Sequence, residues 1–196
     1  VYFQGRETSN KYYEAVPDIV QEYMDKVASV TGRQYHPFDY VGAPDATDVI
    51  VAMGSGCEAI EETIEYLNSV QGKKYGLVKV RLYRPFDVKR FNEALPKSVK
   101  RIAVLDRTKE PGSIGEPLYL DVVAALENKE IRVIGGRYGL SSKEFTPSMI
   151  LAIFKHSEAN GFHGFTVGIN DDVTNKSLKV EEQIVTEPAG TTNCMF

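Results

Sequence analysis

Residues 48–58 read DVIVAMGSGCE: a short apolar run, a turn of two glycines around a serine, and the polar start of a helix. The apolar run is short and nearly continuous, which is typical of a strand that is buried on both faces. From Cys57 to Val70, apolar side chains recur at helical spacing, so this segment predicts a helix that packs back on the strand. Such a strand–turn–helix unit favours an α/β fold.

The same rhythm of strand and helix recurs along the rest of the chain. Further apolar runs predict strands over residues 75–82, 101–105, 131–134 and 165–169. The segments between them predict helices over residues 87–95, 117–126 and 146–159. Because parallel strands need crossover connections, this alternation predicts a three-layer αβα domain with a mostly parallel, five-stranded sheet.

A separate helix precedes this domain. Apolar side chains fall on one face from about Ala15 to Val30, and Gly32 ends the pattern. Pro17 then lies in the first turn, where its missing N–H costs nothing. A polar-aromatic connector follows over residues 35–46 and contains prolines and glycine. We expect this connector to be a loop that links an N-terminal helical extension to the sheet.

These patterns divide the chain into four parts. Residues 1–5 look like the remnant of a protease-cleavable affinity tag and are set aside. Residues 6–46 form the helix and connector, and residues 47–173 form the αβα domain. Residues 174–196 lack strong periodicity and are expected to be a linker toward a further domain. We therefore expect one excised domain of a larger multidomain protein, with no catalysis of its own.

Composition excludes several classes of function. The 196-residue chain has a net charge of -4, which disfavours nucleic acid and anionic membranes as partners. No apolar run approaches the roughly 20 residues that cross a bilayer. Two cysteines cannot form a disulfide framework or hold an iron–sulfur cluster, and their scarcity is typical of a reducing, cytoplasmic location. No histidine pair has zinc-site spacing, and Asp171-Asp172 favours a solvated turn, so we expect no metal site.

Charged residues follow every predicted strand. Because ligands and partners of parallel sheets meet the carboxyl ends of the strands, this polar rim is the candidate functional edge. Arg84, Arg107 and Arg137 each follow a strand closely. Their planar guanidinium groups suit carboxylates on a neighbouring domain. We take Arg107 and Arg137 as interface candidates, and no residue as catalytic.

The turn Gly54-x-Gly56-x-x-Ala59 resembles a dinucleotide fingerprint, since it follows a strand and opens a helix. Gly54, Ser55, Gly56 and Arg84 are therefore an alternative anion site for a phosphate of NADP or coenzyme A. Glutamates in the first turns of the helix would repel a phosphate, and the second strand ends without a ribose-binding acid. A tight turn that needs small residues is the favoured interpretation.

Two further features have open interpretations. Cys57 lies near a helix N-terminus, but without a neighbouring histidine it favours a half-buried thiol over a nucleophile. Residues 35–40 contain three aromatic side chains, which are costly to leave exposed. This segment either folds back over the sheet or docks on another domain, and His36 is interpreted as a packed loop histidine.

Six segments together resemble one known family. They are YVGAPDA (40–46), VIVAMGS (49–55), KVRLYRPF (79–86), AVLDRTKEPG (103–112), GGRYGL (135–140) and FTVGINDDVT (165–174). In this order they are similar to the second domain of pyruvate:ferredoxin oxidoreductases, over nearly the whole chain after residue 5. The resemblance implies a fold like that of the transketolase C-terminal domain.

The resemblance also implies what the parent protein does. It would decarboxylate pyruvate on thiamine diphosphate and magnesium, form acetyl-CoA from coenzyme A, and pass electrons through iron–sulfur clusters to ferredoxin or flavodoxin. The family binds thiamine and pyruvate through its first and last domains, and coenzyme A largely through its third. None of those motifs occurs here, so no cofactor-binding residue is expected.

On this basis the domain is a structural scaffold between other domains of a homodimeric, cytoplasmic or organellar parent. Residues 187–196 resemble the connector into the third domain. The equivalent domain of pyruvate:NADP oxidoreductases or of sulfite reductase flavoproteins is the alternative.

Overall fold

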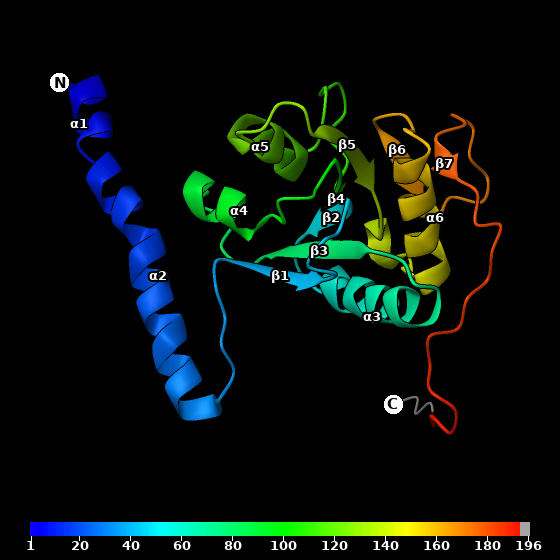
Figure 1. Ribbon diagram of the computed structural model, residues 1–196. Coiled ribbons are helices and arrows are strands. Elements are labelled where there is room, and N and C mark those ends of the chain that lie inside the picture. Colours follow the sequence, from blue (N-terminus) through cyan, green and yellow to red (C-terminus); the bar gives the residue numbers. More distant parts are fainter. Residues whose placement is uncertain (193–196) are drawn as a thin grey trace.

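A seven-stranded mixed sheet organises the computed structural model, which describes residues 1–192 (Figure 1). Its strands are β1 (Phe38–Gly42), β2 (Asp48–Ala52), β3 (Tyr75–Val80), β4 (Arg101–Asp106), β5 (Arg132–Arg137), β6 (Phe165–Val167) and β7 (Ser177–Leu178). They lie in the order β1-β3-β2-β4-β5-β6-β7, and every neighbouring pair is parallel except β1 and β3. The predicted α/β class and mostly parallel sheet are confirmed.

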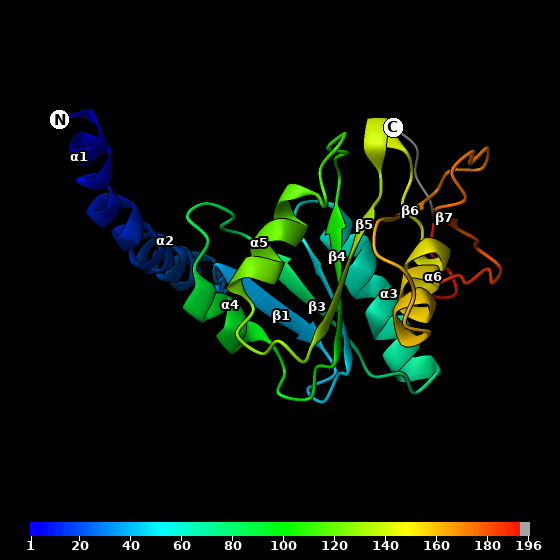
Figure 2. The ribbon, with the colours of Figure 1, turned by 90° about the horizontal axis from the view of Figure 1, so that it is seen from above.

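Helices α3 to α6 cover both faces of this sheet, and α1 and α2 lie to one side of it. The helices of residues 1–192 are α1 (Tyr2–Glu7), α2 (Asn10–Thr31), α3 (Gly56–Val70), α4 (Val88–Ala94), α5 (Pro117–Ala125) and α6 (Pro147–Glu158), with a short 3-10 turn at Leu140–Ser142. Side chains of α3 and α6 form one buried cluster with the sheet, and those of α4 and α5 form the other. Figure 2 shows these two helical layers on either side of the strands, so the three-layer arrangement is also confirmed.

The predicted number of five strands is too low. The connector contributes β1, an antiparallel edge strand that pairs with β3 from Phe38↔Val80 to Gly42↔Gly76. An antiparallel neighbour needs no crossover helix. β1 is therefore not part of the alternation of strands and helices from which β2 to β6 were predicted. The segment expected to be a linker contributes the two-residue strand β7, which pairs with β6 and is too short to show any periodicity.

The N-terminal helix also begins earlier than predicted. α2 starts at Asn10, so Pro17 lies inside the helix and not in its first turn. The proline removes one helical hydrogen bond, but it is the buried residue of α2 and borders a surface hollow with Pro85 and Phe86. Residues 2–7 form α1, and the assignment of residues 1–5 to a tag stays a prediction. None of the helices within residues 1–192 combines the length and apolar character that a bilayer crossing requires.

At Gly42 the backbone of β1 approaches the backbone of β3 very closely. Its φ is +120°, and a Cβ atom there would lie 2.4 Å from the carbonyl oxygen of Tyr75 and 2.8 Å from the Cα of Gly76. Both contacts are to backbone atoms, which cannot rotate away. The turn glycine Gly54 also has positive φ, +78°, but a Cβ there meets no atom within 4 Å.

We expect Gly42→Ala to lower the free energy of unfolding by about 2–5 kcal/mol, because strain at positive φ and overpacking against backbone add together. Gly54→Ala carries only the first of these costs, about 1–2 kcal/mol. Urea denaturation of the two variants measures the difference. Equal costs at the two positions would show that the β1–β3 contact is looser than described.

Candidate functional site

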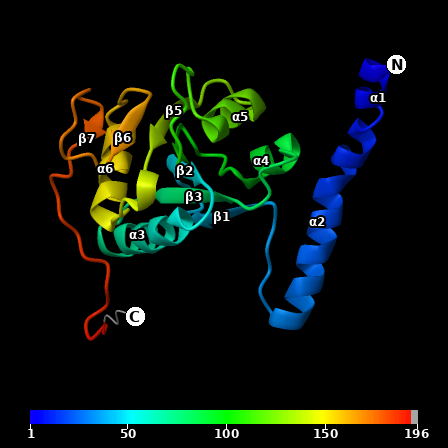
Figure 3. The ribbon, with the colours of Figure 1, turned by 180° about the vertical axis from the view of Figure 1, so that it is seen from behind.

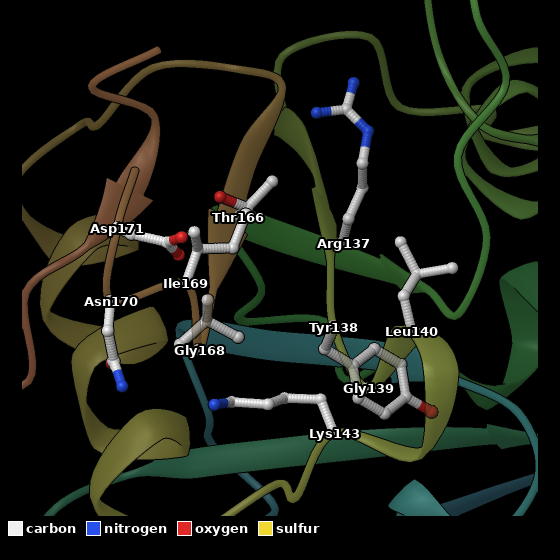
Figure 4. Close-up of a pocket in the computed structure, with 11 residues that line it drawn as sticks. Arg137, Tyr138, Gly139, Leu140, Lys143, Thr166, Gly168, Ile169, Asn170 and Asp171 are labelled. Carbon is white, nitrogen blue, oxygen red and sulfur yellow. The ribbon is translucent and has the colours of Figure 1, made fainter. Parts of the chain in front are cut away.

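A cavity of about 300 Å³ opens at the carboxyl ends of β5 and β6 (Figure 4). Two segments line it, residues 137–140 with Lys143 and residues 166–171. β5 ends at Arg137 and β6 ends at Val167, so the two loops that follow them rise from the same edge of the sheet. The cavity therefore lies on the polar rim that the sequence indicated.

The free polar groups of this cavity are of mixed character. The side chains of Lys143, Asn170 and Asp171 are exposed and make no hydrogen bond or ion pair within residues 1–192. The hydroxyl oxygen of Thr166 is buried without a hydrogen-bond partner in the same part of the chain. An amine, an amide, a carboxylate and a hydroxyl around a partly apolar hollow suit contact with a polar protein surface. They do not place a nucleophile beside a base.

Arg137 is an internal residue of this edge. Its Nε donates to Oε1 of Glu116 at 2.6 Å and its Nη1 donates to the carbonyl of Gly164 at 3.0 Å. The Arg137 side chain is 11% exposed and the Glu116 side chain 2%. Figure 4 shows the guanidinium extended away from Lys143. Arg137 is thus committed to a buried ion pair, although its role as an interface candidate stays a prediction.

Arg107, unlike Arg137, is exposed. Its Nε donates to the carbonyl of Gly139 at 2.8 Å, and its Nη1 approaches Oγ of Ser55 at 3.5 Å. The guanidinium therefore bridges two loops and still faces solvent. Of the two interface candidates, Arg107 is the one whose charge is accessible to a neighbouring domain.

The structure explains why both positions 54 and 56 of the turn that leads into α3 are glycine. Gly54 adopts positive φ, and a Cβ at Gly56 would lie 2.4 Å from the hydroxyl oxygen of Tyr138. Arg84 is directed elsewhere: it donates to Asp121 at 2.6 Å and stacks on the ring of Tyr83 at 3.9 Å. The structure brings Arg107 to this turn through Ser55 and does not show Arg84 there. The anion site of Gly54, Ser55, Gly56 and Arg84 stays a prediction.

Glutamates at the start of α3 are paired with a buried lysine. Lys79 is 6% exposed and forms ion pairs with Glu61 and, at 3.4 Å, with Glu58. Burial lowers the pKa of Lys79, but the two carboxylates outweigh that effect and hold the pKa above its usual range. These two carboxylates place negative charge at the N-terminus of α3, which disfavours binding of a phosphate there.

A buried carboxylate supports the other helical layer. Asp106 at the end of β4 is 1% exposed and accepts hydrogen bonds from the backbone N–H groups of Leu118 at 2.9 Å and Tyr119 at 3.1 Å. Burial raises the pKa of Asp106, and these two hydrogen bonds oppose the rise. Sequence reasoning missed Asp106, Glu116, Lys143 and Thr166. The charged run between β4 and α5 was the available signal for the first two.

Asp172 organises the loop after β6. It accepts hydrogen bonds from the N–H groups of Thr174 at 2.9 Å and Ser177 at 2.6 Å, and these bonds lower its pKa to about 2. Its carboxylate is therefore used by the turn itself. Within residues 1–192, no group of three His, Cys, Asp or Glu residues could hold a metal ion.

The aromatic connector folds back on the sheet, as one of the two alternatives predicted. Phe38 is buried and packs against Phe86 and Phe91 with ring centroids 5.1 and 5.6 Å apart. His36 contacts Asp39 at 2.8 Å. Tyr35 lies outside this packing and stacks under Arg81 at 4.7 Å.

Cys57 is buried, and burial raises its pKa to about 11, while Lys79 acts in the opposite direction. A raised pKa keeps the thiol protonated at neutral pH. We therefore expect iodoacetamide at pH 8 to modify Cys57 at least roughly tenfold more slowly in the native protein than in guanidinium chloride, as followed by peptide mass spectrometry. Equal rates in the two states would mean that Cys57 is accessible in the native protein and reacts as an ordinary thiol. The second cysteine, Cys194, lies outside the described residues.

Comparison with known proteins agrees with the resemblance found in the sequence. A family model described as pyruvate:ferredoxin oxidoreductase core domain II matches residues 46–150. The pyruvate:ferredoxin oxidoreductase of Moorella thermoacetica is 60% identical over 199 residues, and the pyruvate-flavodoxin oxidoreductase of Enterobacter agglomerans is 54% identical over 200. Each alignment covers 100% of this chain and 17% of the relative.

A third relative has a different electron acceptor in its name. The pyruvate dehydrogenase [NADP(+)] of Cryptosporidium parvum is 51% identical over 203 residues, which cover 100% of this chain and 10% of that protein. This chain thus spans about a sixth or less of the length of these relatives. Because the family model covers more than half of it, the chain belongs to the pyruvate:ferredoxin oxidoreductase family, as a core domain II.

Proposed function

We propose that this chain is a non-catalytic scaffold domain of a pyruvate:ferredoxin or pyruvate:flavodoxin oxidoreductase. The observation that carries the proposal is that most charged groups at the carboxyl edge are tied to other groups of the same domain. Arg137 pairs with Glu116, Arg84 with Asp121, and Asp172 with its own loop. Such an edge has a defined shape and charge, which suits contact with a neighbouring domain.

The parent reaction follows from the names of the relatives and from the family resemblance. We propose oxidative decarboxylation of pyruvate to acetyl-CoA and CO2, with electrons passing to ferredoxin or flavodoxin. The NADP-linked relative keeps pyruvate:NADP oxidoreductase open as the alternative parent. The domain would then contribute to the shape of the enzyme and not to its bond-breaking steps.

The cofactors of that reaction do not fit the residues of this chain. Iron–sulfur clusters use about four cysteine thiolates, and the chain has two cysteines. The described residues also bring no three His, Cys, Asp or Glu side chains together that could hold a metal ion. We therefore assign thiamine diphosphate, the clusters and the coenzyme A site to other domains of the same polypeptide. We propose a homodimeric, cytoplasmic parent, with an organelle as the alternative location.

Arg107 provides the test. In the full-length protein we expect Arg107→Ala to loosen domain packing, because it removes an accessible charge that pairs with the adjacent domain. The loosening should appear as faster limited proteolysis between domains and a lower unfolding temperature. Arg33→Ala makes the same change at an exposed position outside the rim and should leave both readouts unchanged. Unchanged proteolysis and an unchanged unfolding temperature in the Arg107 variant would contradict the scaffold role of this edge.

A further inference from the structure

A second surface of the molecule has no partner within residues 1–192. α2 runs beside the αβα body and does not cover either face of the sheet (Figures 1 and 3). Contacts near the middle of α2 hold it: Pro17 is buried, Nη2 of Arg90 donates to Asp18 at 2.6 Å, and Nε2 of Gln21 donates to the carbonyl of Tyr35 at 3.2 Å. Polar contacts of this kind position a helix but bury little apolar surface.

The exposed side of α2 is apolar along three turns. Ile19 is 50% exposed, Tyr23 61% and Val27 46%, and the four-residue spacing places them on one face. Soluble helices bury such a stripe against a core. Here the stripe borders a hollow of about 450 Å³, which is lined by Ile19, Val20, Tyr23, Met24, Val27, Tyr35 and Arg81.

The opposite wall of the hollow is held in place. Arg81 donates through Nε to Asp39 at 2.5 Å and stacks over the ring of Tyr35 at 4.7 Å. The hydroxyl groups of Tyr23 and Tyr35 make no hydrogen bond within residues 1–192. The hollow thus has an apolar side formed by α2, a wall held by the Arg81–Asp39 ion pair, and two phenol groups at its margin. This is the character of a protein-docking groove.

We infer that this groove, made by α2, Tyr35 and Arg81, binds an apolar segment of the same polypeptide from outside residues 1–196. This inference rests on the proposed scaffold function and names one of its surfaces. The segment would carry aliphatic or aromatic side chains into the hollow, with backbone carbonyls placed to accept from the two tyrosine hydroxyls.

The size of the groove favours a tethered occupant over a separate molecule. Seven residues line it, whereas a stable interface between separate chains involves about 20–30 residues on each side. A segment of the same polypeptide has an effective concentration in the millimolar range, so a small groove suffices to hold it. The relatives are about six times as long as this chain. A parent polypeptide of that length contains many segments outside residues 1–196 that could occupy the groove.

Hydrogen exchange in the full-length protein tests the inference. We expect the backbone amides of residues 16–31 to be protected. Val27→Asp should speed their exchange at least tenfold, together with that of one segment outside residues 1–196. Ser29→Asp places the same charge near the same helix end, about 200° around the helix from Val27, and should change neither. Unchanged exchange in the Val27 variant would overturn the inference.

A photo-crosslinker at position 23 identifies the occupant without disrupting the groove. Benzoylphenylalanine in place of Tyr23 should join residues 16–31 to that outside segment. In dimers mixed from ¹⁴N- and ¹⁵N-labelled protein, the crosslinked peptide should carry one isotope only. Mixed-isotope products would make the occupant a second copy, and no product would leave the groove empty; either result overturns the inference. Because Arg107→Ala tests a different edge, failure of the groove and failure of the scaffold role are distinguishable.

Discussion

Arg137→Ala is expected to destabilise the folded chain by about 3–5 kcal/mol, because the variant leaves the carboxylate of Glu116 buried without its cation. Glu116 is 2% exposed at its side chain and already has one oxygen, Oε2, without a hydrogen-bond partner within residues 1–192. Its other oxygen keeps only the N–H of Glu110 at 3.4 Å when the guanidinium is removed. Urea denaturation measures the loss.

Arg84→Ala is the matched control for that prediction. It removes the same side chain from an ion pair of similar length, 2.6 Å, but Arg84 is 55% exposed and Asp121 27%. Water replaces the lost partner there, so the expected cost is at most about 1 kcal/mol. Adding Glu116→Gln to Arg137→Ala removes the orphaned charge and should recover part of the loss. Similar costs for Arg84 and Arg137, or no recovery in the double variant, would place Glu116 in contact with water.

Strands β2 to β6 could be predicted because their central residues are largely buried on both faces of the sheet. All five residues of β2 are buried, and residues 49–52 after the initial Asp48 form an uninterrupted apolar run in the sequence. β1 lies at the edge, and its burial falls from Phe38 to Gly42. Its mixture of aromatic, acidic and glycine residues therefore carries no clear period, and only the tertiary contact with β3 makes it a strand.

The carboxyl edge was predicted as a region, but its pairings were not. The ion pair of Arg137 with Glu116 joins residues 21 positions apart, and it depends on how the loop after β4 returns to α5. The cavity depends on the turn at Leu140–Ser142, where Ser141 and Ser142 adopt φ of 53° and 61°. Serine has no strong preference for this conformation, so no sequence signal places Lys143 beside Gly168.

Gly136 and Phe165 form a second pair that no pattern in the sequence predicted. They are register partners on β5 and β6, and a Cβ at Gly136 would lie 2.1 Å from the Cζ of Phe165. The aromatic ring thus occupies the space that the missing side chain leaves, and Phe165 is 0% exposed. The glycine at position 136 is therefore explained by packing against this ring.

Phe165→Ala is expected to cost about 3–5 kcal/mol, because it opens a cavity in a fully buried position. Gly136→Ala should cost about 1–3 kcal/mol through overpacking against the ring. In the double variant the new methyl group occupies part of the vacated space, so its cost should fall below the sum of the single costs by at least about 1 kcal/mol. Denaturant unfolding of the four proteins in this cycle measures the coupling. Strictly additive costs would mean that the ring moves aside for the new methyl group, and that the sheet tolerates side chains at this position.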